Sequence, residues 1–222
     1  MKQNILVAGA TGTVGLEVVS ALGARGVSPR VLVRRARAND GLPASVARVS
    51  GELSDRASLD RALDGIDAAF FVTPHDPREE ELGAQFVSAC ETAGVKRIVF
   101  SCAFRPRASN AFTRAIVHSV LGFVGPHYRA KFRTERRVHA SRLDPVVLLP
   151  SNFFQNDEAV LEDIGRGEYA VPIGRKLVNR VDCADVGLAA ARALLDREAV
   201  RAGAYALVGP EEFTGATAAA GK

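Results

Sequence analysis

The sequence predicts an α/β fold with a doubly wound parallel sheet, and three observations support this prediction. An apolar strand at residues 5–8 leads directly into a glycine-rich turn at residues 9–15 and then into a helix. Strand-like apolar runs go on alternating with helix-period segments to about residue 150. The runs at residues 67–72 and 97–101 are almost continuously apolar, as expected for strands that helices cover on both faces.

Turn residues and the spacing of apolar residues predict where each strand and helix lies. Apolar runs bounded by turn residues predict strands at residues 4–8, 30–34, 46–50, 67–72, 97–101 and 145–149. Helical spacing predicts helices at residues 13–25, 57–64, 79–93 and 127–141. Beyond residue 153 we expect a helix at 157–165, a polar strand at 178–181, a helix at 183–195 and a strand at 204–208. The ending from residue 214 is rich in small residues and is expected to fray.

Composition limits the classes of protein to which the chain can belong. It has 222 residues, 47% of them hydrophobic and 24% charged, which is enough to bury the core of one α/β domain. The net charge is only +4 and the basic residues are spread along the chain, so we expect no nucleic acid partner. No apolar stretch is long enough to cross a bilayer and no signal-type segment begins the chain, so we expect a cytoplasmic protein without a membrane partner.

Three cysteines, Cys90, Cys102 and Cys183, are odd in number and far apart in the sequence. No C-x-x-C pair and no Cys/His cluster is present, which indicates a reducing compartment and no metal site. We expect all three to pack in the interior, although Cys102 follows a predicted strand and could lie near a cofactor.

The glycines of the first turn, Gly9, Gly12 and Gly15, stand three residues apart. The first allows a sharp turn, the second lets the backbone approach a pyrophosphate, and the third lets the helix pack on the strand. The unpaired N–H groups and the positive dipole end of that helix attract phosphate. We therefore predict a dinucleotide-binding turn, with an ordinary glycine-rich turn as the alternative, made by Gly9, Ala10, Thr11, Gly12, Thr13, Val14 and Gly15.

The end of the second predicted strand indicates which dinucleotide binds. NAD-binding versions of this unit carry an Asp or Glu there to accept hydrogen bonds from the ribose hydroxyls. Here Val33 is followed by Arg34 and Arg35, whose guanidinium groups cannot accept those bonds but can pair with a 2′-phosphate. We therefore expect NADP(H) to be preferred over NAD(H), with a solvated basic strand end as the alternative.

Ligands of doubly wound sheets bind beyond the carboxyl ends of the strands. The further residues expected to contact the cofactor therefore follow predicted strands: Glu52, Leu53, Thr73, Pro74, Ser101, Pro150, Asn152 and Phe153. His75 and Asp76 fit either a place near the nicotinamide or a turn built on the neighbouring prolines. An apolar segment at residues 112–123 fits either a helix over the pocket or an oligomer face.

The chain resembles the NmrA-like group of atypical short-chain dehydrogenases/reductases in several segments and in their order and spacing. The resemblance covers nearly the whole chain. It rests on the turn at residues 9–15, the strand end at 33–35, and the segments 51–55, 93–101, 127–135, 149–156 and 203–211. The resemblance implies an NAD(P)-binding Rossmann core at residues 1–150 and a small, reduced substrate lobe at residues 151–222 that is integrated with it. Members of this group usually continue for some tens of residues beyond the late Gly-Pro-Glu turn. We therefore expect a substrate pocket that is open, completed by a partner subunit, or vestigial.

The resemblance also suggests a catalytic pair, although the chain departs from the usual Tyr-x-x-x-Lys pattern. His127 stands four residues before Lys131 and shares its helix face, whereas Tyr128 is only three residues before it. By resemblance, Lys131 binds the nicotinamide ribose; His127 can donate a proton near neutral pH. The alternatives are that His127 caps or packs the helix start and that Lys131 forms a surface pair with Glu135.

Two functions follow from these residues. The first is an NADP(H)-dependent oxidoreductase that transfers hydride to a small carbonyl, quinone or enone-type acceptor, since the cofactor carries the chemistry and the protein orients it. The second is a redox sensor that binds NADP(H) without turnover and acts through a protein partner. The expected partners are accordingly a small-molecule substrate and, as open alternatives, a second copy of the chain or another protein.

Overall fold

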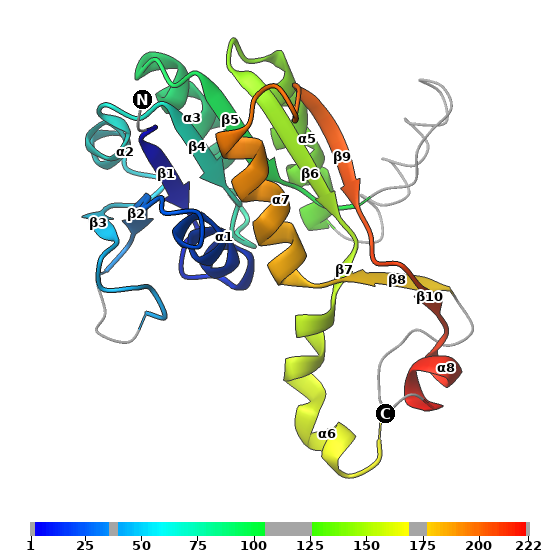
Figure 1. The fold of residues 1–222 in the computed structure, drawn as a ribbon. Coiled ribbons are helices and arrows are strands. Elements are labelled where there is room, and N and C mark those ends of the chain that lie inside the picture. Colours follow the sequence, from blue (N-terminus) through cyan, green and yellow to red (C-terminus); the bar gives the residue numbers. More distant parts are fainter. Residues whose placement is uncertain (1–2, 36–39, 105–125, 169–176, 221–222) are drawn as a thin grey trace.

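The computed structural model describes residues 3–35, 40–104, 126–168 and 177–220, and within them seven parallel strands form the main sheet (Figure 1). From one edge to the other the strands are β3 (Ala47–Ser50), β2 (Arg30–Val33), β1 (Ile5–Ala8), β4 (Ala68–Phe71), β5 (Arg97–Ser101), β6 (Asp144–Pro150) and β9 (Gly203–Leu207). The chain builds outward from β1 to β3 and then returns to continue on the other side of β1 with β4. This order confirms the predicted doubly wound α/β fold, and it places the point where the strand order reverses between β1 and β4.

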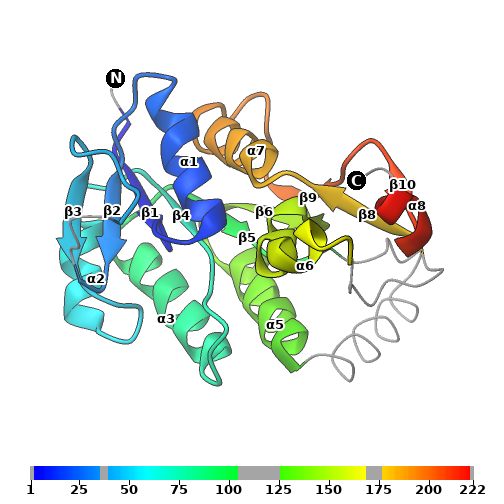
Figure 2. The same cartoon turned by 90° about the horizontal axis from the view of Figure 1, so that it is seen from below.

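Helices cover both faces of the main sheet (Figure 2). On one face lie α1 (Thr13–Gly23) and α7 (Cys183–Leu195), and on the other lie α2 (Arg56–Leu63), α3 (Glu79–Thr92) and α5 (Pro126–Ala140). Successive residues of a strand point to opposite faces, so Ile5 and Val7 pack with α1 while Leu6 and Ala8 pack with α2 and α3. Because both faces are buried, the central strands β1 and β4 are apolar at every position.

A second sheet lies beyond the carboxyl end of β6 and has the order β10-β8-β7 in the described part of the chain. Its strands are β7 (Asn152–Phe153), β8 (Val178–Val181) and β10 (Glu212–Phe213). The 3-10 helix η1 (Phe154–Val160) and the short helices α6 (Leu161–Gly165) and α8 (Gly215–Ala220) belong to the same region, and α6 projects away from the main sheet (Figure 1). The C-terminal part of the chain thus contributes both a small separate sheet and, through β9, the last strand of the main one.

The predicted elements of the main sheet are confirmed, with ends that differ by at most two residues. Two predictions in the second half are wrong. The helix expected at residues 157–165 is a 3-10 helix followed by one short α-helical turn, because no residue of η1 or α6 is buried and so no packed apolar face favours a longer α-helix. The ending expected to fray carries α8.

Two further expectations concern an apolar segment over the pocket or at an oligomer face, and the absence of a membrane-spanning helix. The segment at residues 112–123 lies outside the described residues. Among the helices that the structure does describe, none is both long and apolar enough to span a bilayer.

Candidate functional site

Close contacts shape the glycine turn between β1 and α1. Gly9 has a φ of +84°, and a Cβ atom there would lie 2.6 Å from Val72 Cγ1. A Cβ atom on Gly15 would lie 2.0 Å from the carbonyl oxygen of Gly9, so only glycine lets α1 begin so close to the strand. A Cβ atom on Gly12 would meet only that same oxygen, at 3.5 Å. Packing therefore requires the first and third glycines, whereas the second leaves space for a ligand.

The start of α1 offers backbone donors to that space. Gly12 is the N-cap residue, and no side chain caps the helix. A helix start without a cap has unpaired N–H groups and the positive end of the helix dipole, which together bind anions. The exposed residues of the turn are Thr11, Gly12 and Thr13, and the buried ones are Ala10, Val14 and Gly15. The buried three can therefore contribute only backbone groups to a bound phosphate.

A cavity of about 370 Å³ lies at the carboxyl ends of β1, β2, β3 and β4. This volume falls within the range of roughly 300–1,000 Å³ that is usual for ligand pockets. The residues predicted to bind a cofactor that line it are Gly9, Thr11, Arg34, Glu52, Leu53 and Pro74. It is also lined by His75, Asp76 and Arg78, of which the sequence suggested the first two only as one of two alternatives. The residues at the reversal of strand order therefore surround one pocket.

The two arginines after β2 differ in their position relative to the cavity. Arg34 lines it, whereas Arg35 is exposed but is not part of its lining. The loop after β3 also lines the cavity and carries Glu52, whose backbone N–H donates to the Ser58 hydroxyl at 3.1 Å. Of the two arginines after β2, Arg34 thus lines the pocket and Arg35 does not, and Arg78 lines it from the segment after β4.

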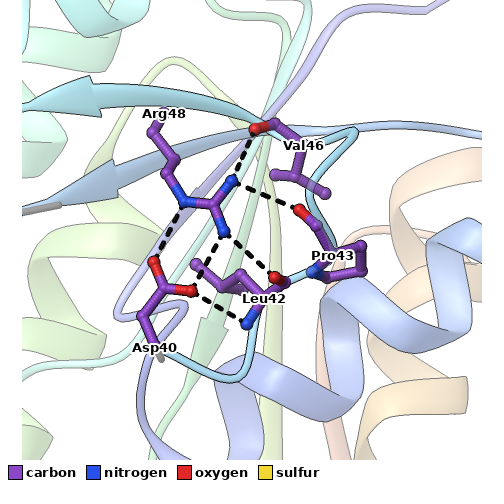
Figure 3. A network of polar contacts seen from close by, with 5 residues as sticks. All are labelled: Asp40, Leu42, Pro43, Val46 and Arg48. Carbon is purple, nitrogen blue, oxygen red and sulfur yellow. Dashed lines mark hydrogen bonds and ion pairs between the residues drawn. The ribbon is translucent and has the colours of Figure 1, made fainter. Parts of the chain in front are cut away.

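The connection from β2 to β3 is held by an ionic network that we call the Arg48 clamp (Figure 3). The guanidinium of Arg48 donates twice to the Asp40 carboxylate, at 3.0 Å each, and once each to the carbonyl oxygens of Leu42, Pro43 and Val46. These five bonds use all five N–H donors of the side chain. Parallel strands are usually joined by a crossover helix. In a helix the backbone N–H groups would bond the carbonyl oxygens. In the described part of this connection, the Arg48 side chain donates to three of these oxygens.

The Arg48 clamp is also strongly ionic. The hydrogen bonds from Arg48 lower the pKa of Asp40 from its usual 3.8 to about 2, and a further hydrogen bond from the backbone N–H of Leu42 acts in the same direction. The side chains of Leu42 and Val46 are buried in the core beside α1. The clamp therefore anchors the loop that begins at Arg34 to the body of the domain.

A second polar group, which we call the Lys131 cluster, joins Thr73, Glu79 and Lys131. Lys131 Nζ lies 2.9 Å from Glu79 Oε1 and 3.1 Å from Thr73 Oγ1, and the Thr73 hydroxyl donates to Glu79 Oε1 at 2.5 Å. All three residues are buried, with relative exposures of 4%, 1% and 7% respectively. Thr73 precedes Pro74, which lines the cavity, so the cluster lies at the same strand end as the pocket. Thr73 and Lys131, which were each predicted to contact the cofactor, thus lie in contact with each other, and their binding role stays a prediction.

The alternative surface pair between Lys131 and Glu135 is wrong, because both side chains are buried and Lys131 pairs with Glu79. Glu135 instead lies 3.6 Å from His139 Nε2 and 4.0 Å from Cys102 Sγ. The thiol of Cys102 also lies 3.8 Å from the carbonyl oxygen of Lys131, so this cysteine packs against the cluster. The side chain of His127 lies outside the described residues.

Among the predicted cofactor residues that follow the later strands, Ser101, Pro150, Asn152 and Phe153 lie away from the cavity lining. Ser101 and Pro150 are buried at the ends of β5 and β6. Asn152 is exposed on β7, and Phe153 packs against the core under α1 and α7. Their binding role stays a prediction.

All three cysteines are free and buried, as predicted. Burial raises the pKa of Cys183 to about 12, so its thiol stays protonated and inert at neutral pH. Cys90 and Cys102 lie in the core on one side of the main sheet, and Cys183 lies in the core on the other side. Among the described residues no group of His, Cys, Asp and Glu side chains could hold a metal ion.

Glu79 is the residue that the sequence analysis missed. It begins α3 and is followed by Glu80 and Glu81, a pattern that indicates acidic residues favoured at a helix N-terminus. Nothing in that pattern separates the buried carboxylate from its exposed neighbours. One signal in the sequence could have indicated Glu79. It is a threonine at a strand end that is followed by an acidic residue at the start of the next helix, together with a lysine far downstream.

The residues present fit a dinucleotide, because the turn at residues 9–15 has the shape that a phosphate group needs and a Cβ atom at Gly9 or Gly15 would destroy it. A model of a family described as NAD(P)H-binding matches residues 9–194 of the chain.

Two curated relatives have enzyme names. The NAD(P)H azoreductase of Xenophilus azovorans is 30% identical over 97% of this chain and 71% of its own length. The (4-alkanoyl-5-oxo-2,5-dihydrofuran-3-yl)methyl phosphate reductase of Streptomyces griseus is 33% identical over 95% of this chain and 69% of its own length.

The solved structures that share the fold include two oxidoreductases. A quinone oxidoreductase of Escherichia coli complexed with NADPH matches with a TM-score of 0.79 and 21% identity, covering 97% of this chain and 73% of that one. A triphenylmethane reductase of Citrobacter sp. complexed with NADP(H) matches with a TM-score of 0.76 and 24% identity, covering 95% of this chain and 72% of that one.

Proposed function

The chain belongs to the NAD(P)H-binding family, and on that premise we propose that it is an NADP(H)-dependent oxidoreductase that reduces a small carbonyl, quinone or enone-type acceptor. The relatives named as reductases support an oxidoreductase role. The observation that carries the proposal is the opening of the glycine turn into a cavity that Arg34 lines. This pocket combines a backbone site for a diphosphate with a guanidinium group for a further phosphate.

We assign the diphosphate to the turn before α1. The backbone N–H groups at the start of this helix donate to the phosphate oxygens, and the absence of a side chain on Gly12 allows the approach. Arg34 pairs with the 2′-phosphate, and Glu52 and Leu53 flank the adenine from the loop after β3. The Arg48 clamp keeps the loop after Arg34 attached to the domain.

We assign the nicotinamide half to the Lys131 cluster. A bound NADPH supplies the hydride, and the residues of the chain supply position and charge. The ammonium group of Lys131 has three N–H donors, and its contact with the Thr73 carbonyl oxygen, at 3.4 Å, is at the long limit for a hydrogen bond. That donor is the one most easily given to a ribose hydroxyl. His127 remains our sequence-based assignment for the proton that the acceptor takes up.

The test is to measure cofactor binding and turnover separately. Calorimetry with NADPH and NADH is expected to show binding of both, with NADPH the tighter ligand. NADPH oxidation is then followed with a panel of quinones, aldehydes, enones and, in view of the azoreductase relative, azo compounds. A rate with any acceptor that falls in Lys131→Met supports the enzyme. No heat with either cofactor would refute the proposal.

One observation favours the second candidate, a sensor that binds NADP(H) without turnover. The ammonium group of Lys131 is almost completely buried and already neutralised by Glu79. A protein that only reports cofactor state needs no mobile lysine. Tight NADPH binding without oxidation by any acceptor would support the sensor over the enzyme.

A further inference from the structure

The carboxylate of Glu79 has one fully engaged oxygen and one without a partner. Oε1 accepts from the Thr73 hydroxyl and from the ammonium group of Lys131. Oε2 is buried and has no hydrogen-bond partner among the described residues. A buried polar atom without a partner costs about 1–3 kcal/mol, and more when it is charged. The fold therefore retains this carboxylate at a cost in stability.

Burying an ion pair is itself poor evidence for a stabilising role. Desolvation of two charges often exceeds their attraction, and apolar residues of similar size commonly serve stability as well or better. The cluster nevertheless connects three elements at one place: the end of β4 through Thr73, the start of α3 through Glu79, and α5 through Lys131. Its effect is to fix the ammonium group at the strand end where the cavity lies.

A neighbouring ion pair shows what a simple link between the same helices looks like. Glu80 of α3 and Arg133 of α5 lie 2.7 Å apart, but their side chains are about half exposed, at 50% and 53%. Exposed pairs of this kind contribute little to stability. The chain thus joins α3 and α5 at the surface with a solvated pair and, one residue earlier on α3, with a buried pair at the strand end where the pocket lies.

We propose that Glu79 is a positioning residue, which holds Lys131 at the end of β4 so that its ammonium group meets the nicotinamide half of the bound cofactor. This inference rests on the proposed cofactor and deepens the proposed site. Glu79 acts through Lys131 and Thr73 and does not contact the ligand. Its loss should therefore affect the nicotinamide half and spare the adenosine half, which binds at the glycine turn and Arg34.

The experiment compares two ligands by calorimetry: NADPH, and adenosine 2′,5′-bisphosphate, which lacks the nicotinamide half. Glu79→Gln is expected to weaken NADPH binding about tenfold, the loss of roughly one charge-assisted hydrogen bond, and to change the affinity for adenosine 2′,5′-bisphosphate less than about twofold. Glu80→Gln, the matched control on the same helix, is expected to change neither affinity. Glu79→Asp, which keeps the carboxylate, is expected to recover part of the loss.

A double substitution tests whether Glu79 acts through the lysine. In a Lys131→Met background, adding Glu79→Gln is expected to cause no further loss of NADPH affinity, because the group that Glu79 holds is already gone. The double variant leaves no unpaired charge in the interior and so also serves if Glu79→Gln alone folds poorly.

Three results would overturn the proposal: equal weakening of both ligands by Glu79→Gln, tighter NADPH binding in that variant, or additive losses in the double variant. If the unsubstituted chain binds neither ligand, the proposed cofactor is wrong and the positioning role falls with it. If it binds both without turnover, only the enzyme assignment fails, and the binding comparison still decides the role of Glu79.

Discussion

The Arg48 clamp and the Lys131 cluster are both ionic groups in the loops and helices around the pocket, yet they differ in how completely they are satisfied. The clamp uses every donor of its arginine and joins residues eight positions apart. The cluster leaves one carboxylate oxygen without a partner among the described residues and joins residues 58 positions apart. A saturated network has nothing left to offer a ligand, so the clamp supports the chain. The cluster instead holds the ammonium group of Lys131, whose contact with the Thr73 carbonyl oxygen is long enough to leave a donor for a ligand.

The largest effect is expected from breaking the buried pair. Lys131→Met leaves the carboxylate of Glu79 in the interior without its cation and should lower the free energy of unfolding by about 3–5 kcal/mol. Urea denaturation measures this loss. Adding Glu79→Gln removes the buried charge and should recover most of it. A loss below about 1 kcal/mol for Lys131→Met, the size typical of an exposed pair, would contradict the burial of the cluster.

The next largest effect is expected at Arg34, which lines the pocket at the end of β2. Arg34→Ala should weaken NADPH binding about 10- to 100-fold, as expected for a lost guanidinium–phosphate pair, and NADH binding less than about twofold. Arg35→Ala is the matched control, because Arg35 does not line the cavity, and should cost much less. Calorimetry with both cofactors measures the ratio. Equal losses of NADPH and NADH affinity would argue against the phosphate assignment.

A smaller effect is expected from opening the Arg48 clamp. Arg48→Met removes the donors to three carbonyl groups and to Asp40, and should lower the Tm measured by calorimetric unfolding. Arg48→Lys should recover little of this loss, because an ammonium group cannot reproduce the planar fork of a guanidinium. Arg56→Met, which breaks an exposed pair with Asp60, is the control and should leave the Tm nearly unchanged. Full recovery in Arg48→Lys would show that charge alone matters.

The smallest effect is a pH dependence of the clamp. The pKa of Asp40 is lowered from 3.8 to about 2 in the folded protein, so its contribution to stability is fully present above about pH 4 and is lost as the pH falls towards 2. Asp40→Asn lacks this contribution at every pH. The difference in free energy of unfolding between the unsubstituted chain and this variant should therefore shrink between about pH 4 and pH 2. A constant difference over that interval would contradict the ionic character of the clamp.

The sequence predicts the main sheet well because its evidence is local. Strands buried on both faces must be apolar throughout, and helices on a sheet must repeat their apolar residues at helical spacing, so each element is visible in its own few residues. The prediction is wrong at residues 157–165 and at residues 215–220. There no buried residue of η1 or α6 fixes the helix type, and small residues form α8 where composition suggested a frayed end.

The same distinction explains the site. The glycine spacing at residues 9–15 and the arginine after β2 lie within single turns, and they led directly to residues that shape or line the pocket. Glu79 was missed because three acids at a helix start are equivalent until folding buries one of them. Cys102 and Glu135 likewise meet only because α5 packs on the sheet.

The sequence by itself thus determined the alternating α/β order, the backbone-lined phosphate turn and a guanidinium at the cavity, because each depends on neighbours within a few residues. Only the tertiary structure decided that Lys131 is buried, that it pairs with Glu79 and not with Glu135, and that one side chain ties the β2–β3 loop together. Those choices depend on which distant side chains share a dry interior, where an unpaired charge is costly, and a linear pattern of residues does not contain that information.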